Sequence, residues 1–122
     1  MAVVNPVITA YDKKGWGPAQ AFLVSWEGVT ESDTCARYIA PVMNDGIISV
    51  DGTFGGTSVA LHGSNDPADA NFIVLKDIED TVIGISAAGH SQVAQHPLQY
   101  KPVLTGGSGT TINIRLLLYG KG

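Results

Sequence analysis

This sequence has few charged residues and a single cysteine. Only 15 % of its 122 residues are charged, and Cys35 is the single cysteine. One cysteine excludes a disulfide within the chain, and a free thiol usually packs as a small apolar side chain. The low charge leaves much of the surface to uncharged groups, which is typical of a protein that works against a partner.

Long hydrophobic runs and basic clusters are also missing. No stretch approaches the roughly 18 apolar residues that span a bilayer, and the opening residues lack the charged and apolar regions of a signal peptide. The net charge is −4, and the basic residues are scattered rather than gathered into a stripe that would suit nucleic acid. We therefore expect no membrane partner, no nucleic-acid partner and synthesis in the cytoplasm.

Glycine is abundant, with 15 residues that cluster between short apolar segments. Clusters of this kind are typical of turns between β-strands. Strands are expected at residues 3–11, 21–26, 37–43, 47–54, 57–63, 72–75, 81–86, 100–105 and 110–119. The pairs of glycines at 55–56 and 106–107 predict hairpin turns, whereas residues 87–95 fit either a short helix or a crossing loop.

The spacing of these segments, roughly 10 residues, predicts the architecture. We expect one all-β domain over residues 1–122, an antiparallel β-sandwich of jelly-roll or immunoglobulin-like type with about eight strands and little helix. Alternation within the strands places one set of side chains in the core. That set is Phe22, Val24, Ile48, Val50, Val59, Leu61, Ile112 and Ile114.

Three segments predict contacts with other subunits. Residues 1–11 include Pro6, which cannot donate to a ladder, so they form an edge strand or an N-terminal arm that pairs with a neighbour's sheet. The run 116–119 is apolar on both faces, which predicts cover by another subunit. Trp16 lies between two glycines in a loop, where it either anchors an interface or folds back onto its own domain. The expected interface residues are Val3, Val4, Pro6, Ile8, Trp16, Tyr100, Leu117 and Tyr119.

Signals for catalysis or metal binding are weak. His62, His90 and His96 lack the close pairing of metal ligands, and the acidic residues between 66 and 80 lack the pattern of a calcium loop. No Gly-x-Ser-x-Gly elbow occurs. We expect neither an enzyme nor a bound cofactor or metal.

Three stretches carry a resemblance to a known class of proteins. They are the opening AVVNPVITAYD at 2–12, DGTFGGTSVALHGSND at 51–66, and YKPVL at 100–104 followed by GGSGTT at 106–111 and the final strand. Together they cover about half of the chain. In these stretches the sequence resembles the capsid decoration, or cement, proteins of tailed bacteriophages.

The resemblance implies a structural role in the virion. Such a protein is made in the host bacterial cytoplasm, lies on the capsid surface, binds the major capsid protein and bridges its subunits, and associates with itself as a homodimer or homotrimer. The alternative is a carbohydrate-binding or tail or baseplate β-sandwich. Aromatic side chains at Trp16, Tyr38 and Tyr100 would favour sugar binding if they clustered in a solvent-facing cleft.

Overall fold

The computed structural model describes residues 2–11, 21–40 and 45–119 and shows an all-β chain in that part. Seven strands have five or more residues: β2 (Val7–Tyr11), β3 (Ala21–Val29), β6 (Asp45–Thr53), β7 (Ser58–Ser64), β10 (Gly89–Val93), β11 (Gln99–Thr105) and β12 (Thr111–Tyr119). Five more are pairs of residues: β1 (Val3–Val4), β4 (Thr34–Cys35), β5 (Tyr38–Ile39), β8 (Ile73–Val74) and β9 (Gly84–Ile85). These five two-residue strands explain why the structure has twelve strands in the described residues, whereas about eight were expected.

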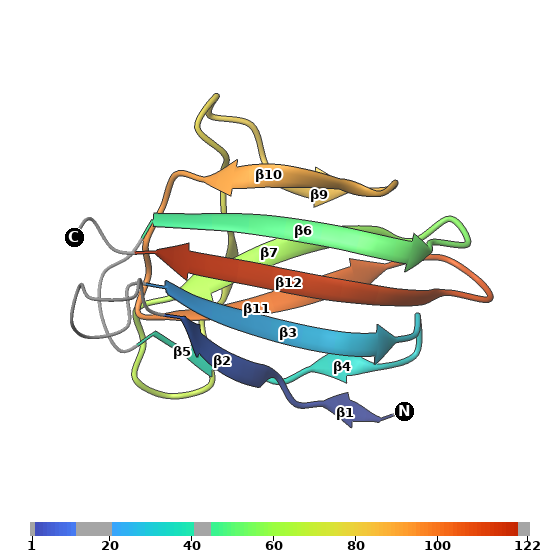
Figure 1. Cartoon of the computed structure of the whole chain (residues 1–122), viewed down its shortest axis with the longest axis horizontal. Helices are drawn as coiled ribbons and strands as arrows, with labels where there is room; N and C mark the ends of the chain where they lie inside the picture. The colour runs from blue at the N-terminus through green and yellow to red at the C-terminus, as the bar shows by residue number, and fades with distance from the viewer. Residues whose placement is uncertain (1, 12–20, 41–44, 120–122) are drawn as a thin grey trace.

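Ten of the strands form two sheets that pack face to face (Figure 1), and β1 and β4 form a separate two-stranded sheet. One sheet has the order β10-β6-β12-β3-β2, and the other has the order β5-β11-β7-β8, with β9 also paired to β7. Every pairing within these two sheets is antiparallel. The prediction of an antiparallel β-sandwich is therefore confirmed.

The N-terminal residues join both layers at one side of the sandwich. β2 is the edge strand beside β3, whereas β1 pairs in parallel with β4, which lies against β11 of the second sheet. Pro6 lies between β1 and β2, where neither ladder requires its missing N–H. The segment is thus an edge strand of its own sandwich, one of the two alternatives that the sequence left open.

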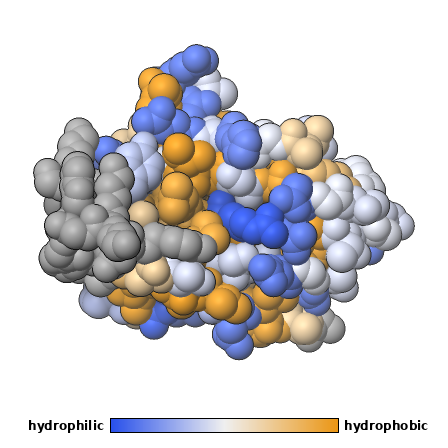
Figure 2. Space-filling view, in the orientation of Figure 1, coloured by the Kyte–Doolittle hydropathy of each residue, from blue (hydrophilic) through white to orange (hydrophobic). Residues whose placement is uncertain are grey.

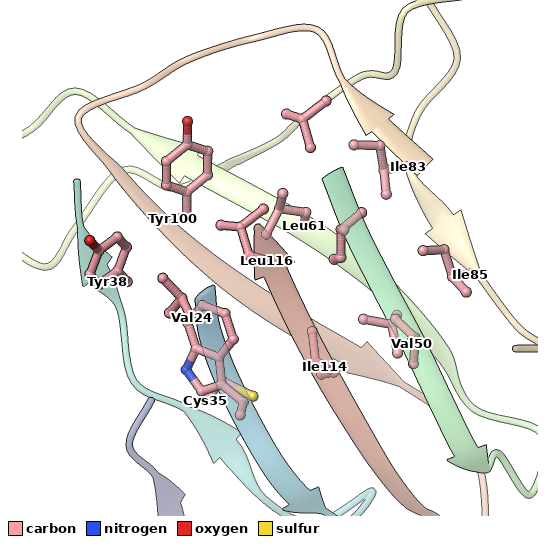
Figure 3. Packing of buried hydrophobic residues seen from close by; sticks show 14 of the residues in the cluster. Val24, Cys35, Tyr38, Val50, Leu61, Ile83, Ile85, Tyr100, Ile114 and Leu116 are labelled. Carbon is pink, nitrogen blue, oxygen red and sulfur yellow. The ribbon is translucent and has the colours of Figure 1, made fainter. Parts of the chain in front are cut away.

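The core lies between the sheets and comes from the inward row of each strand. Figure 3 shows Val24, Val50, Ile114 and Leu116 of one sheet facing Leu61 of the other. Seven of the eight predicted core residues are at most 2 % exposed: Val24, Ile48, Val50, Val59, Leu61, Ile112 and Ile114. Phe22 is half-buried, because it lies near the end of β3.

The two glycine turns do not close hairpins, so that prediction was wrong. The turn after β6 leads into β7 and the turn after β11 leads into β12, and in each case the two strands belong to different sheets. Glycines with positive φ allow such a sharp reversal whether the chain stays in its sheet or crosses to the next. Each turn is therefore an arch between the layers.

Residues 87–95 also differ from expectation, since they contain β10 rather than a helix or a crossing loop. β10 pairs with β6 over its whole length. The hydroxyl of Ser49 and Nδ1 of His90, opposite each other in this pairing, lie 2.7 Å apart. Polar cross-strand contacts of this kind support an edge strand whose own sequence, GHSQV, has little hydrophobic content.

Candidate functional site

Exposed apolar side chains lie along the N-terminal edge of the sandwich, which we define as Val3, Val7 and Ile8. These side chains are 64 %, 60 % and 48 % exposed. No charged residue occurs between Ala2 and Tyr11. The sandwich therefore presents an uncharged apolar strip along one side, at the bottom of the view in Figure 1.

The other two predicted interface residues in this segment are less accessible. Val4 is half-buried and packs against the core cluster, and its carbonyl oxygen accepts a hydrogen bond of 2.8 Å from the Ala36 amide. Pro6 is also half-buried. Both residues fix the path of the chain between the layers, so a partner would meet chiefly their exposed neighbours.

The outer face of the sheet β10-β6-β12-β3-β2 carries a row that contains both polar and apolar side chains. The cross-strand register places Thr9, Leu23, Leu117, Ile47 and Gln92 side by side from one edge to the other. The three central apolar residues are half-buried, as is Tyr119. Figure 2 shows hydrophobic surface on this face beside a strongly hydrophilic band. Cover of Leu117 and Tyr119 by another subunit stays a prediction.

A polar network lies one row away from Leu117 along β12. Arg115 Nη1 approaches Asp51 Oδ2 to 2.6 Å, and the Asn113 amide donates to Asp51 Oδ1 at 3.1 Å. The hydrogen bond from Asn113 and then the contact with Arg115 lower the pKa of Asp51. Arg115 and Asp51 thus offset each other's charge on this face.

Tyr38 and Tyr100, considered from the sequence as candidate surface residues, are buried. Tyr100 is 2 % exposed and Tyr38 is 9 % exposed, and both lie in the core (Figure 3). Tyr100 pairs with Gly63 across the sheet, and a Cβ atom at that glycine would clash with the ring of Pro97. The interface role predicted for Tyr100 was wrong, because a buried ring offers no surface. Trp16 lies outside the described residues.

The buried side chain that anchors the loop between β7 and β8 was missed by sequence reasoning. Gln99 is fully buried, and its Nε2 donates to the carbonyl oxygens of Asp66 and Ala68 at 2.7 and 2.8 Å. Its Oε1 accepts from Arg37 Nη1 at 2.9 Å. A glutamine at the end of a strand is ordinarily read as exposed, so nothing in the sequence signals this anchor.

Next to that loop is a cleft of about 400 Å³. Its lining includes the amide side chains of Asn65, Asn71 and Gln95 together with His96, and it contains no carboxylate, lysine or arginine. The hydroxyl of Ser64, also in the lining, donates to the Ala70 carbonyl at 2.7 Å and is held within the loop. The cleft therefore presents no activated nucleophile from this serine.

Cys35 and His62 are titratable groups whose pKa values are shifted by burial. Burial raises the pKa of the Cys35 thiol to about 12, and burial also lowers the pKa of His62. Among the described residues, no three histidine, cysteine, aspartate or glutamate side chains gather where they could hold a metal ion. That part of the chain also has no helix with the length and hydropathy of a membrane span.

Comparisons of the chain with protein-family models, curated proteins and solved structures give no match. The class of protein is therefore defined by the structure alone. It is an antiparallel β-sandwich with one uncharged, apolar edge and a half-buried apolar row on an outer face.

Proposed function

We propose that this protein is a structural component of a tailed-phage virion, a decoration protein that binds the outer capsid and bridges subunits of the major capsid protein. The N-terminal edge is the observation that carries the proposal. A folded domain normally buries apolar side chains of this size, and an uncharged apolar strip on a rigid scaffold suits burial against another protein.

The rigidity of the scaffold supports the same function. A decoration protein has to hold a fixed shape between capsid subunits, and preorganised surfaces lose little entropy on binding. Here the edge is fixed by two β-pairings, β1 with β4 and β2 with β3. The proposal includes self-association of the decoration protein as a dimer or trimer.

The alternative of sugar binding receives no support from the tyrosines that would have favoured it. Stacking on a saccharide needs exposed aromatic faces, whereas Tyr38 and Tyr100 lie in the core. The lining of the cleft beside Asn65 and Gln95 contains no tryptophan, tyrosine or phenylalanine. We therefore place assembly ahead of carbohydrate recognition.

Cosedimentation with purified capsids of the phage that encodes the chain tests the proposal. Full-length protein should sediment with capsids, and raising the salt concentration should change binding little, because apolar burial rather than ion pairing supplies the affinity. The double variant Val3→Ser, Val7→Ser should bind at least roughly tenfold more weakly, since two apolar contacts are lost. Its matched control is Ile73→Ser, which removes a side chain that is 70 % exposed on β8. Failure of the full-length protein to bind any capsid would overturn the proposal.

A further inference from the structure

We propose that β2 pairs edge to edge, in antiparallel orientation, with β2 of a second copy of this chain. The pairing would join two five-stranded sheets across a two-fold axis into one continuous sheet. It deepens the proposed function, on whose self-association it rests, by naming the partner, the strand and the symmetry.

The first argument is the character of this edge. Among the described strands, β2 has β3 on one side and no strand on the other. Its sequence, VITAY, contains no charge and no proline, and its five residues pair with β3 without a bulge. A regular, uncharged edge exposes backbone donors and acceptors that can template another strand.

The other described edges are protected in ways that β2 is not. β5, β8 and β9 are only two residues long, which is one way in which proteins limit edge pairing. At the far edge of the same sheet, the end of β10 is covered by residues 76–77. Val93 forms a bridge with Asp77, and the Ala94 amide donates to the Lys76 carbonyl at 3.0 Å.

The second argument concerns the partner strand. In a two-fold dimer the edge of β2 pairs with an identical edge rotated by 180°, so the segment has to be compatible with itself. An antiparallel register centred on Thr9 places Ile8 of one copy opposite Ala10 of the other, so a large side chain faces a small one. Like charges directly opposite would destabilise such a pair, and this segment has none. A two-fold dimer is also the commonest closed form of a homo-oligomer.

Burial completes the argument. Ile8 is 48 % exposed, although it belongs to the inward row that also contains Val24 and Leu116. A strand added beside β2 would cover the open side of that row. The pairing therefore buries an apolar side chain that the single chain leaves half in water.

Charge substitutions at Thr9 test the inference, with the self-association constant measured by analytical ultracentrifugation. Thr9 is exposed, so a charge there leaves the monomer folded, as circular dichroism will check. Thr9→Lys alone and Thr9→Glu alone should each weaken the dimer by roughly tenfold, because each places like charges opposite one another. An equimolar mixture of the two variants should restore dimers.

Gln92 supplies the matched control. It is exposed on β10, in the same cross-strand row as Thr9 but at the opposite edge of the sheet. Gln92→Lys and Gln92→Glu should dimerise as the wild type does. A cysteine at each position gives a second readout: Thr9→Cys should form a disulfide-linked dimer under mild oxidation, and Gln92→Cys should not.

Each outcome separates this inference from the proposed function. A wild-type chain that is monomeric at its highest soluble concentration, or a dimer that the Thr9 variants leave intact, would overturn the β2 pairing. If that monomer still sediments with capsids, decoration stands without it. A β2-paired dimer that binds no capsid would contradict decoration alone. Restoration of dimers by mixing supports pairing with a second copy rather than with a different protein.

Discussion

The hydroxyl of Thr110 donates a 2.7 Å hydrogen bond to the carbonyl oxygen of Phe54 and thereby ties the two arches of the sandwich together. A reciprocal bond runs from the Thr57 hydroxyl to the Gly106 carbonyl at 2.8 Å. Both threonines are buried. The two arches come from the stretches 51–66 and 100–119, so those stretches form one structural unit in which β6 pairs with β12 and β7 pairs with β11.

Replacement of Thr110 by valine should destabilise the fold by about 1–3 kcal/mol, because it keeps the shape but leaves the Phe54 carbonyl without this donor. Urea unfolding followed by circular dichroism measures the change. The neighbouring Thr111 is exposed, so Thr111→Val is the matched control and should alter the free energy of unfolding by less than about 0.5 kcal/mol. Equal stability of the two variants would show that the arches are not fastened through Thr110.

Gly55 should tolerate no side chain. Its φ is +58°, and a Cβ atom there would lie 2.1 Å from the carbonyl oxygen of Ser108. Gly55→Ala should therefore cost about 3 kcal/mol or more. At Gly109 the φ is +67° but nothing lies within 4 Å of the added atom, so Gly109→Ala should cost only the backbone strain of about 1–2 kcal/mol. Thermal unfolding of both variants would reveal the contrast, and a smaller loss at Gly55 would contradict the packing of the arches.

The arches show where prediction from sequence ended. Alternation in β3, β6, β7 and β12 predicted the inward rows, because a strand's parity depends only on its own residues. A glycine turn can lead into a strand of the same sheet or into a strand of the other sheet, depending on which strands the next segment pairs with. The sequence at Gly55 is compatible with both outcomes. The interface prediction for Tyr100 failed for a related reason: the ring becomes buried only when the two sheets pack together, which the residues of β11 alone do not show.

The candidate site was predicted in part. The exposure of Val3 and Ile8 follows from an apolar segment that lies at an edge, and Pro6 indicated that position in advance. The buried anchor Gln99 could not be foreseen, because its partners are backbone carbonyls of a loop about 30 residues away. A hydrogen bond to a carbonyl oxygen leaves no trace in the identity of the residue that supplies it.

Acid should loosen the arches through Glu31. Its carboxylate accepts hydrogen bonds from its own backbone amide and from the amides of Thr110 and Gly109, which lower its pKa below the usual 4.5. A carboxyl whose pKa is lower in the folded state contributes stability above its unfolded pKa, and that contribution is lost as the pH falls through the folded value. Unfolding free energies measured below pH 5 should therefore fall less steeply for Glu31→Gln than for the wild type. Ser32→Ala, at the adjacent exposed position, should keep the wild-type slope, and identical slopes for all three proteins would contradict this role of Glu31.

The thiol of Cys35 should be unreactive in the folded protein. It is 2 % exposed, and burial raises its pKa to about 12, so both access and thiolate formation are suppressed. A colorimetric thiol reagent at pH 8 should react with the native chain only as fast as it unfolds, and should react at once in strong denaturant. Immediate stoichiometric reaction of the native protein would place this thiol at the surface instead of in the core.

A cryo-EM map of the intact virion, with this chain traced in it, tests the central claim most directly. The account predicts density for the sandwich on the outer capsid surface, with Val3 and Val7 buried against a capsid subunit or against another copy of the chain. Density for the chain in the tail or baseplate, or a virion that lacks the chain altogether, would contradict it.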